Sequence, residues 1–158
     1  MTVNNVSDED NASAIVEVES IPYLLDTSAL FSFIEDEAGA DRVEQALRQS
    51  TTLLPWLVLL ETYYITLQEE GQAEADRRIA LIKQLKVKIV WDMDEPTLLT
   101  AARLKANHRV SLADAVIAAV AMRRSAVLMH KDPEFEALTG LLRMEALPYK
   151  SFVDKSQC

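Results

Sequence analysis

Short apolar runs alternate with helical patterns along this chain, and this alternation constrains the fold more than any other feature. Apolar runs of strand length occupy residues 21–25, 52–54, 87–91, 126–129 and 143–147. Helical patterns occupy residues 28–34, 39–50, 55–70, 72–85, 95–107, 111–124 and 132–138. Strands that alternate with helices are typical of a parallel sheet covered by helices on both faces. The sequence therefore predicts a three-layer α/β/α domain.

The length and the charge distribution indicate one domain between two tails. A chain of 158 residues is long enough for one domain with its own core. Residues 1–20 hold five acidic side chains and no Lys or Arg, so we expect an acidic, flexible N-terminal tail. We expect the folded domain over residues 21–150 and a C-terminal tail over residues 151–158.

Cysteine usage and hydropathy suggest a compartment. Cys158 is the only cysteine, so no disulfide can form within the chain, and a reducing environment is the simplest interpretation. No apolar run reaches the roughly 18 residues that a membrane span needs. The N-terminus lacks a basic stretch followed by an apolar one, as a secretory signal would have. We therefore expect a cytoplasmic protein that does not insert into a membrane.

Four carboxylates lie in unusually apolar surroundings. Asp26 directly follows the apolar run of residues 21–25, and Asp132 follows the run of residues 126–129 after two residues. Glu61 and Asp114 each lie in a strongly apolar helical segment. A parallel sheet can bring all four positions to the carboxyl ends of its strands, where such sheets have their functional crevice.

Each of these acids also has a purely structural interpretation. Asp26 and Asp132 are suited to helix N-caps, and Pro133 after Asp132 is typical of a first helical position. Asp114 lies three residues after Ser111, which is the spacing of a capping box. Glu61 fits a half-exposed position on a helix. For each acid taken singly, these interpretations remain open.

The four acids taken together favour a metal site. Two carboxylates ~5 Å apart repel each other by roughly 3 kcal/mol at an effective dielectric constant of ~20. A cluster of four therefore needs a bound cation or proton. Oxygen ligands without Cys or His suit Mg²⁺ or Mn²⁺. Such sites activate water and stabilise phosphoryl-transfer transition states, so the pattern indicates hydrolysis of a phosphodiester.

The order of the acidic motifs resembles that of the PIN-domain family, and within it the VapC-like toxins of bacteria and archaea. The motifs are YLLDTSALF, LLETYY, LADAVIAA and HKDPEF, between residues 21 and 147. The resemblance implies a metal-dependent ribonuclease with a central parallel sheet of about five strands. It implies that Asp26, Glu61, Asp114 and Asp132 form the catalytic and metal-binding cluster. It also implies an RNA substrate and a small antitoxin partner.

Further residues match the family or depart from it. Ser28 matches the hydroxyl usually found two residues after the first acid, and Glu134 matches a frequent extra acid near the last one. His130 stands where the family often has Thr or Ser. Its side chain could reach the site or an RNA phosphate, or it could be a polar residue whose hydrogen bonds are satisfied within the domain. Pro55 and Trp56 replace small hydroxyl residues. These departures leave the metal ligands intact and put the substrate contacts in doubt.

The resulting hypothesis is a Mg²⁺- or Mn²⁺-dependent endoribonuclease, the toxin of a toxin–antitoxin pair. The apolar and aromatic residues around 28–34 and 55–68 exceed what one small core needs, so we also expect a homodimer and a small partner that covers a groove near the site. A catalytically silent PIN-like module that binds RNA or protein is an alternative. A phospho-acceptor α/β protein is another, less consistent with Ser28. A run of basic residues forms either an RNA-contacting surface or the solvated face of a helix: Arg77, Arg78, Lys83, Lys86 and Lys88.

Overall fold

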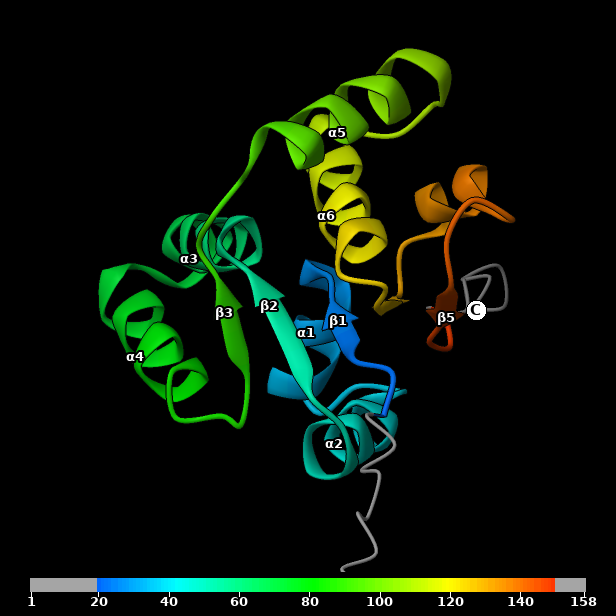
Figure 1. Cartoon of the computed structure of the whole chain (residues 1–158). Helices are drawn as coiled ribbons and strands as arrows, with labels where there is room; N and C mark the ends of the chain where they lie inside the picture. The colour runs from blue at the N-terminus through cyan, green and yellow to red at the C-terminus, as the bar shows by residue number, and fades with distance from the viewer. Residues whose placement is uncertain (1–19, 150–158) are drawn as a thin grey trace, which may run out of the picture.

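The computed structural model of the protein describes residues 20–149, which form a five-stranded parallel sheet between helices (Figure 1). The strands are β1 (Tyr23–Leu25), β2 (Thr52–Pro55), β3 (Lys88–Val90), β4 (Val127–His130) and β5 (Met144–Ala146). Their order is β3-β2-β1-β4-β5, and all neighbours pair in parallel. The predicted fold class is thus confirmed. The tails expected at 1–20 and 151–158 lie outside the described residues, except for Ser20.

Helices cover both faces of this sheet. They are α1 (Thr27–Ile34), α2 (Ala40–Gln49), α3 (Trp56–Glu70), α4 (Gln72–Ile82), α5 (Glu95–Asn107), α6 (Leu112–Arg123) and the 3₁₀-helix η1 (Pro133–Leu138). The chain moves outward from β1 to β2 and β3, then returns past β1 to β4. Right-handed crossovers in opposite directions put α1–α4 on one face and α5–α6 on the other.

Two strands lead into their helices almost without a loop. Asp26 alone separates β1 from α1, and Pro55 ends β2 and is directly followed by α3. Pro55 has an extended conformation, with φ −61° and ψ 145°, which suits both a strand end and a helix N-cap. Side chains at these junctions therefore lie at the carboxyl edge of the sheet.

The core lies between the sheet and its two helical layers. Leu24 and Leu25 of β1, Leu54 of β2 and Leu128 of β4 have no exposed surface. Helix α6 is apolar nearly all round because it packs on α5, on β4 and on α3. Even so, α6 has 12 residues, and no helix within residues 20–149 is both long and apolar enough to cross a membrane.

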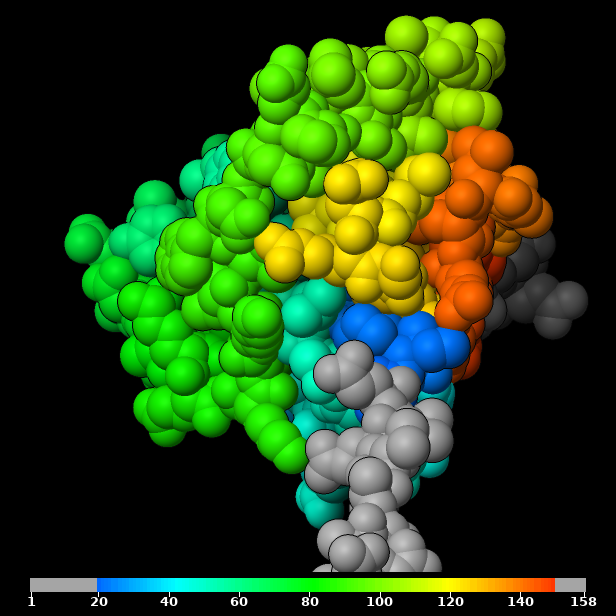
Figure 2. Space-filling model, in the orientation of Figure 1, coloured from blue at the N-terminus to red at the C-terminus, as the bar shows by residue number. Residues whose placement is uncertain are grey.

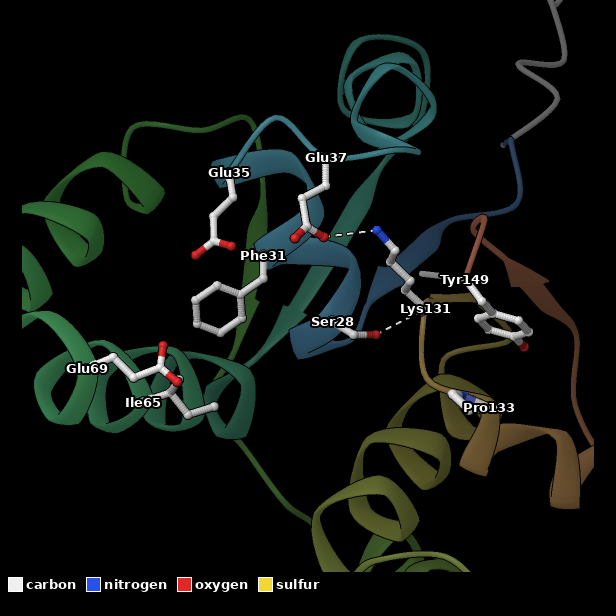
Figure 3. A pocket seen from close by; sticks show the side chains of 9 residues that line it. All are labelled: Ser28, Phe31, Glu35, Glu37, Ile65, Glu69, Lys131, Pro133 and Tyr149. Atoms are coloured by element: carbon white, nitrogen blue, oxygen red, sulfur yellow. Dashed lines mark hydrogen bonds and ion pairs between the residues drawn. The ribbon is translucent and has the colours of Figure 1, made fainter. Parts of the chain in front are cut away.

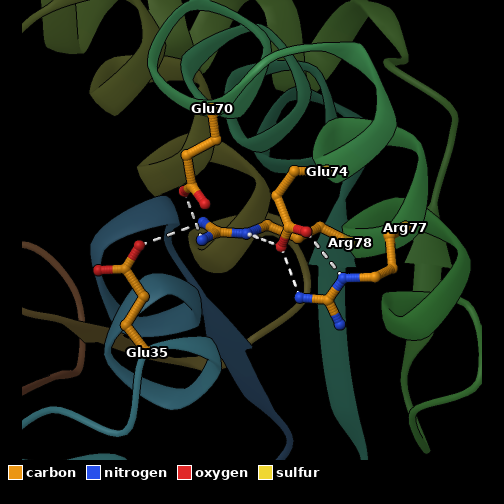
Figure 4. A network of polar contacts seen from close by, with 5 residues as sticks. All are labelled: Glu35, Glu70, Glu74, Arg77 and Arg78. Atoms are coloured by element: carbon orange, nitrogen blue, oxygen red, sulfur yellow. Dashed lines mark hydrogen bonds and ion pairs between the residues drawn. The ribbon is translucent and has the colours of Figure 1, made fainter.

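A buried arginine joins three helices of one layer (Figure 4). The Arg78 guanidinium, on α4, donates to Glu35 at 3.1 Å, to Glu70 at 2.6 Å and to Glu74 at 3.1 Å. It also lies over the ring of Phe31, 5.7 Å from the centroid. Arg78 is only 8% exposed, so it belongs neither to an RNA-contacting surface nor to a solvated helix face, and both expectations are wrong for this residue.

Candidate metal centre

Asp26 is a buried carboxylate at the end of the central strand. It is 3% exposed and caps α1, where its Oδ1 accepts the Ala29 N–H at 2.8 Å. The Ser28 hydroxyl donates to the same carboxylate, at 2.8 Å from Oδ2. Burial, with a smaller contribution from the charge of Asp114, raises the pKa of Asp26 to about 7 in spite of these hydrogen bonds. The capping interpretation of Asp26 is confirmed. The hydrogen bonds of the cap do not offset the free-energy cost of burying this carboxylate.

Ser28 connects this carboxylate to the segment that follows β4. Its Oγ accepts the backbone N–H of Lys131 at 2.8 Å while its hydroxyl hydrogen points to Asp26. The Lys131 ammonium donates to Glu37 at 2.9 Å and to the carbonyl of Ala38 at 3.2 Å. The sequence comparison with the family singled out Ser28 but not Lys131, whose only signal was its place between His130 and Asp132.

Glu61 faces the start of α1. The hydroxyl of Thr27 donates to Oε2 of Glu61, across a separation of 34 residues. Glu61 lies in the second turn of α3, so this bond joins α1 to α3 at the carboxyl edge of the sheet. Sequence analysis missed Thr27, although its position directly after Asp26 puts it beside any site that Asp26 forms.

Asp114 lies in the first turn of α6. Ser111 caps this helix: it accepts the Asp114 N–H at 3.0 Å and donates its hydroxyl to Oδ2 of Asp114 at 2.7 Å. Burial, together with the negative charges of Asp132, Glu134 and Glu61, raises the pKa of Asp114 to about 6. Asp114 is therefore within electrostatic range of all the other candidate acids, including Asp26.

The segment after β4 contributes Asp132, Glu134 and His130. Asp132 caps η1 by accepting the Glu134 N–H at 2.9 Å, and Glu134 is exposed. His130 is 2% exposed, and its Nδ1 lies 2.9 Å from the carbonyl of Asp132, which can only accept, so Nδ1 carries the hydrogen. Its ring packs on Phe135 at 5.1 Å. Burial lowers the pKa of His130, as for a satisfied neutral histidine.

The candidate acids share one edge but do not form a closed cage. Within residues 20–149, no three His, Cys, Asp or Glu side chains stand close enough together to hold a metal ion. Three of the acids are instead bound to hydroxyls: Asp26 to Ser28, Glu61 to Thr27, and Asp114 to Ser111. The donor set still fits a hard divalent ion, because it offers only carboxylate and hydroxyl oxygens. Metal binding would require these carboxylates to turn toward one another.

A groove of about 660 Å³ adjoins this edge (Figure 3). Its apolar part includes Phe31 of α1 and Ile65 of α3, and its lining carries three carboxylates, Glu35, Glu37 and Glu69. The single cation of the lining, Lys131, is paired with Glu37. The lining of the groove is therefore partly apolar and carries more carboxylates than cations.

The sequence matches one family model, described as the PIN domain, over residues 23–141. No sequence among the curated proteins compared with it matches.

Solved structures with the same fold include several from toxin–antitoxin systems. VapBC2 from Rickettsia felis, bound to a DNA fragment of its promoter, has a TM-score of 0.68 and 16% identity, covering 81% of this chain and 100% of that chain. VapBC-1 from nontypeable Haemophilus influenzae has a TM-score of 0.64 and 22% identity, and the match covers 80% of this chain and 98% of that chain. Mycobacterium tuberculosis VapC20, a toxin that cleaves the sarcin–ricin loop, has a TM-score of 0.61 and 19% identity, covering 74% and 95%.

Proposed function

This chain belongs to the PIN-domain family, and from this premise we propose that it is a Mg²⁺- or Mn²⁺-dependent endoribonuclease, the toxin of a toxin–antitoxin pair. The observation that carries the proposal is the placement of Asp26. A buried carboxylate whose pKa is raised to about 7 destabilises a domain of this size at neutral pH. A second acid, Asp114, is placed so that it adds to that cost. Such an arrangement is explained by a cation that binds both.

The proposed roles follow from the elements that hold each side chain. Asp26, Asp114 and Asp132 are the metal ligands, and Glu61 completes the cluster or orients water. The divalent ion, when bound, supplies a Lewis acid that activates water for attack on a phosphodiester. Ser28 positions Asp26, because its Oγ is itself fixed by the Lys131 N–H. Accessory roles for Glu134 and His130 stay predictions.

Three hydroxyl groups orient the carboxylates of the proposed cluster. Ser28, Thr27 and Ser111 each hold one carboxylate by a hydrogen bond. A carboxylate has about four acceptor positions, so one hydroxyl bond to each acid would leave positions for a divalent ion. Ser28, Thr27 and Ser111 would thus orient the acids that are proposed to hold the ion.

The proposal is tested by cleavage of single-stranded and structured RNA by the purified protein. Cleavage should occur with Mg²⁺ or Mn²⁺ and stop on addition of EDTA. An Asp114→Asn variant, which keeps the shape of the side chain, should lose cleavage by orders of magnitude. Equal cleavage in EDTA and in Mn²⁺ by a contaminant-free sample would refute the metal mechanism.

A non-cutting PIN-like module is the second candidate. The observation in its favour is that, in residues 20–149, the acids do not converge on one point. Such a module would bind RNA or a protein partner equally well with and without divalent ions. Titration of the protein with Mn²⁺ separates the two, since the nuclease should gain thermal stability on binding and the silent module should not.

The groove beside the site provides the proposed position of the small antitoxin. Its apolar lining and Glu69, which forms no ion pair within the described residues, suit an amphipathic segment that carries Lys or Arg. Co-purification with the product of a neighbouring gene tests this part of the proposal. Failure of that product to bind would refute the partner without affecting the nuclease.

We also propose a homodimer, for which α3 provides support. Leu60, Tyr64 and Leu67 are 52%, 43% and 40% exposed and follow one another at helical spacing. They lie on the opposite side of α3 from its buried residues Val58 and Thr62. A second copy of the chain would cover this apolar stripe.

A further inference from the structure

RNA has to bring its phosphates to a cluster of carboxylates, so the cations of the domain must provide the approach. We propose that the corner between α5 and α6, formed by Arg103, Lys105 and Arg109, holds the RNA backbone as it enters the site. This placement rests on the proposed function. It replaces the surface expected from the sequence around residues 77–88, and it follows from the pairing and position of each cation.

Ion pairs remove six of the cations from consideration. Of the Lys and Arg side chains within residues 20–149, those bound to carboxylates are Arg42, Arg48, Arg77, Arg78, Arg124 and Lys131. A cation that already neutralises a carboxylate adds little attraction for a phosphate. The cations of this range that form no ion pair are Lys83, Lys86, Lys88, Arg103, Lys105, Arg109, Arg123 and Arg143.

Several of the remaining cations lie away from the site. Lys86 and Lys88 line a hollow with Ser20 and Thr52, where β1 and β2 begin, at the amino edge of the sheet. Lys83 precedes them in the same connection. Arg143 directly precedes β5, so it lies at the amino edge as well.

Arg123 is excluded by its place on α6. It lies nine residues after Asp114, which corresponds to roughly 14 Å along a helix. Its charge acts on Asp94, at the start of α5, and contributes to the lowered pKa of that carboxyl.

In the α5–α6 corner, in contrast, Lys105 is connected to the site through the backbone that precedes α6. The Lys105 ammonium donates to the carbonyl of Val110 at 2.7 Å. Val110 directly precedes Ser111, whose hydroxyl donates to Asp114 at 2.7 Å. Arg109 precedes Val110 and is exposed, and Arg103 is exposed on the last turns of α5. Figure 1 shows that α6 starts beside α5.

The other sides of the site repel a polyanion. On the α1 side, the groove carries Glu69, which forms no ion pair within the described residues, beside Glu35 and Glu37, which are bound to Arg78 and Lys131. On the η1 side, Glu134 and Glu136 are exposed. In the space-filling view, α6 lies between α5 and the orange segment that follows β4 (Figure 2). An RNA strand that reaches Asp114 from α5 meets cations, whereas from η1 or α1 it meets carboxylates.

The salt dependence of RNA binding tests this placement. The test variant is Arg103→Gln/Arg109→Gln, which keeps the Lys105–Val110 bond. The matched control is Lys86→Gln/Lys88→Gln, which removes the same charge from the amino edge. The probe is a fluorescent single-stranded RNA of twenty nucleotides, titrated in EDTA over a range of KCl concentrations.

Each lost phosphate contact lowers the salt slope of single-strand binding by about 0.7, so the two substitutions should lower it by about 1.4. If the variant and the wild-type protein bind RNA equally at 1 M salt, the variant should bind roughly 25-fold more weakly at 0.1 M salt. The KM for cleavage in Mn²⁺ should rise in parallel while kcat stays within threefold. The control should keep the slope and the KM of the wild-type protein.

The outcomes separate this inference from the proposed function. If the wild-type protein cleaves RNA and the control loses as much affinity as the test variant, the corner is refuted and the nuclease stands. If the corner variant loses affinity but no protein cleaves in Mn²⁺, the corner stands and the nuclease is refuted. Wild-type protein that neither binds nor cleaves RNA overturns both.

Discussion

Replacing Asp26 by Asn removes a buried charge and keeps the helix cap, because the Asn carbonyl can still accept the Ala29 N–H. The pKa of Asp26 is 3.8 in an unperturbed chain and about 7 in the folded one. The native state therefore holds its proton more tightly. The stability linked to this group is fully present below the unfolded pKa and is lost as the pH rises through the folded pKa.

The size of this effect follows from the shift. At 1.36 kcal/mol per pKa unit, the loss of stability linked to Asp26 is about 4 kcal/mol at pH 8. It is only between about 1 and 2 kcal/mol at pH 5, where the folded state keeps the proton that the unfolded chain has lost. In metal-free protein, the stability of Asp26→Asn relative to wild type should thus increase by about 2–3 kcal/mol from pH 5 to pH 8. For a domain of this length, that is roughly 5–10 °C in the difference of melting temperatures.

The assay is thermal unfolding in EDTA at pH 5 and pH 8, with Asp94→Asn as the matched control. Asp94 also caps a helix, α5, and accepts the Thr97 N–H at 2.9 Å, but it is exposed and its pKa is lowered by that bonding. Asp94→Asn should show no gain in stability at pH 8. If Asp26→Asn is destabilised by the same amount at both pH values, still gains stability with Mn²⁺ and still cuts RNA, Asp26 is only a helix cap.

Three further outcomes are expected. The rise in melting temperature on adding Mn²⁺ should be larger at pH 8 than at pH 6, because Asp26 and Asp114 have raised pKa values and must lose their protons to bind the ion. An equal rise at both pH values would contradict this. Arg78→Met should destabilise the protein by about 2–3 kcal/mol in chemical unfolding, because Glu35 and Glu70 lose their partner and Glu74 keeps only Arg77. The control Arg77→Met, at a 61% exposed side chain, should change little. Light scattering at tens of micromolar should give the mass of a dimer, and Leu60→Glu should shift it toward the monomer; a monomeric wild-type protein would refute the dimer.

The elements of the fold were predictable from the sequence because their signals are local. The expected strand at 52–54 extends by one residue to Pro55, which ends β2 because its fixed φ suits an extended backbone. The expected helix at 132–138 is a 3₁₀-helix, Pro133–Leu138, with Asp132 as its cap. The first difference concerns the end of an element, where local pattern is weakest, and the second concerns the type of a short helix.

The long-range contacts around the site were less predictable. The bonds of Thr27 to Glu61 and of Lys131 to Glu37 join residues 34 and 94 positions apart, and no periodicity connects such pairs. The burial of Arg78 had a local signal that we missed. It lies between the buried residues Ala75 and Ile82, at the spacing of the apolar face of α4, and not on the solvated face.

The parallel pairing of β1 with β4 affects how the protein matures during synthesis. Leu25 pairs with Met129, and the N–H of Asp26 donates to the carbonyl of Met129, across more than 100 residues of chain. At 5–20 residues per second, a ribosome needs roughly 10 s to cover that interval. Until β4 has emerged and joined β1, the acids at positions 26, 114 and 132 cannot meet. Nascent and prematurely terminated chains should therefore lack the proposed metal site.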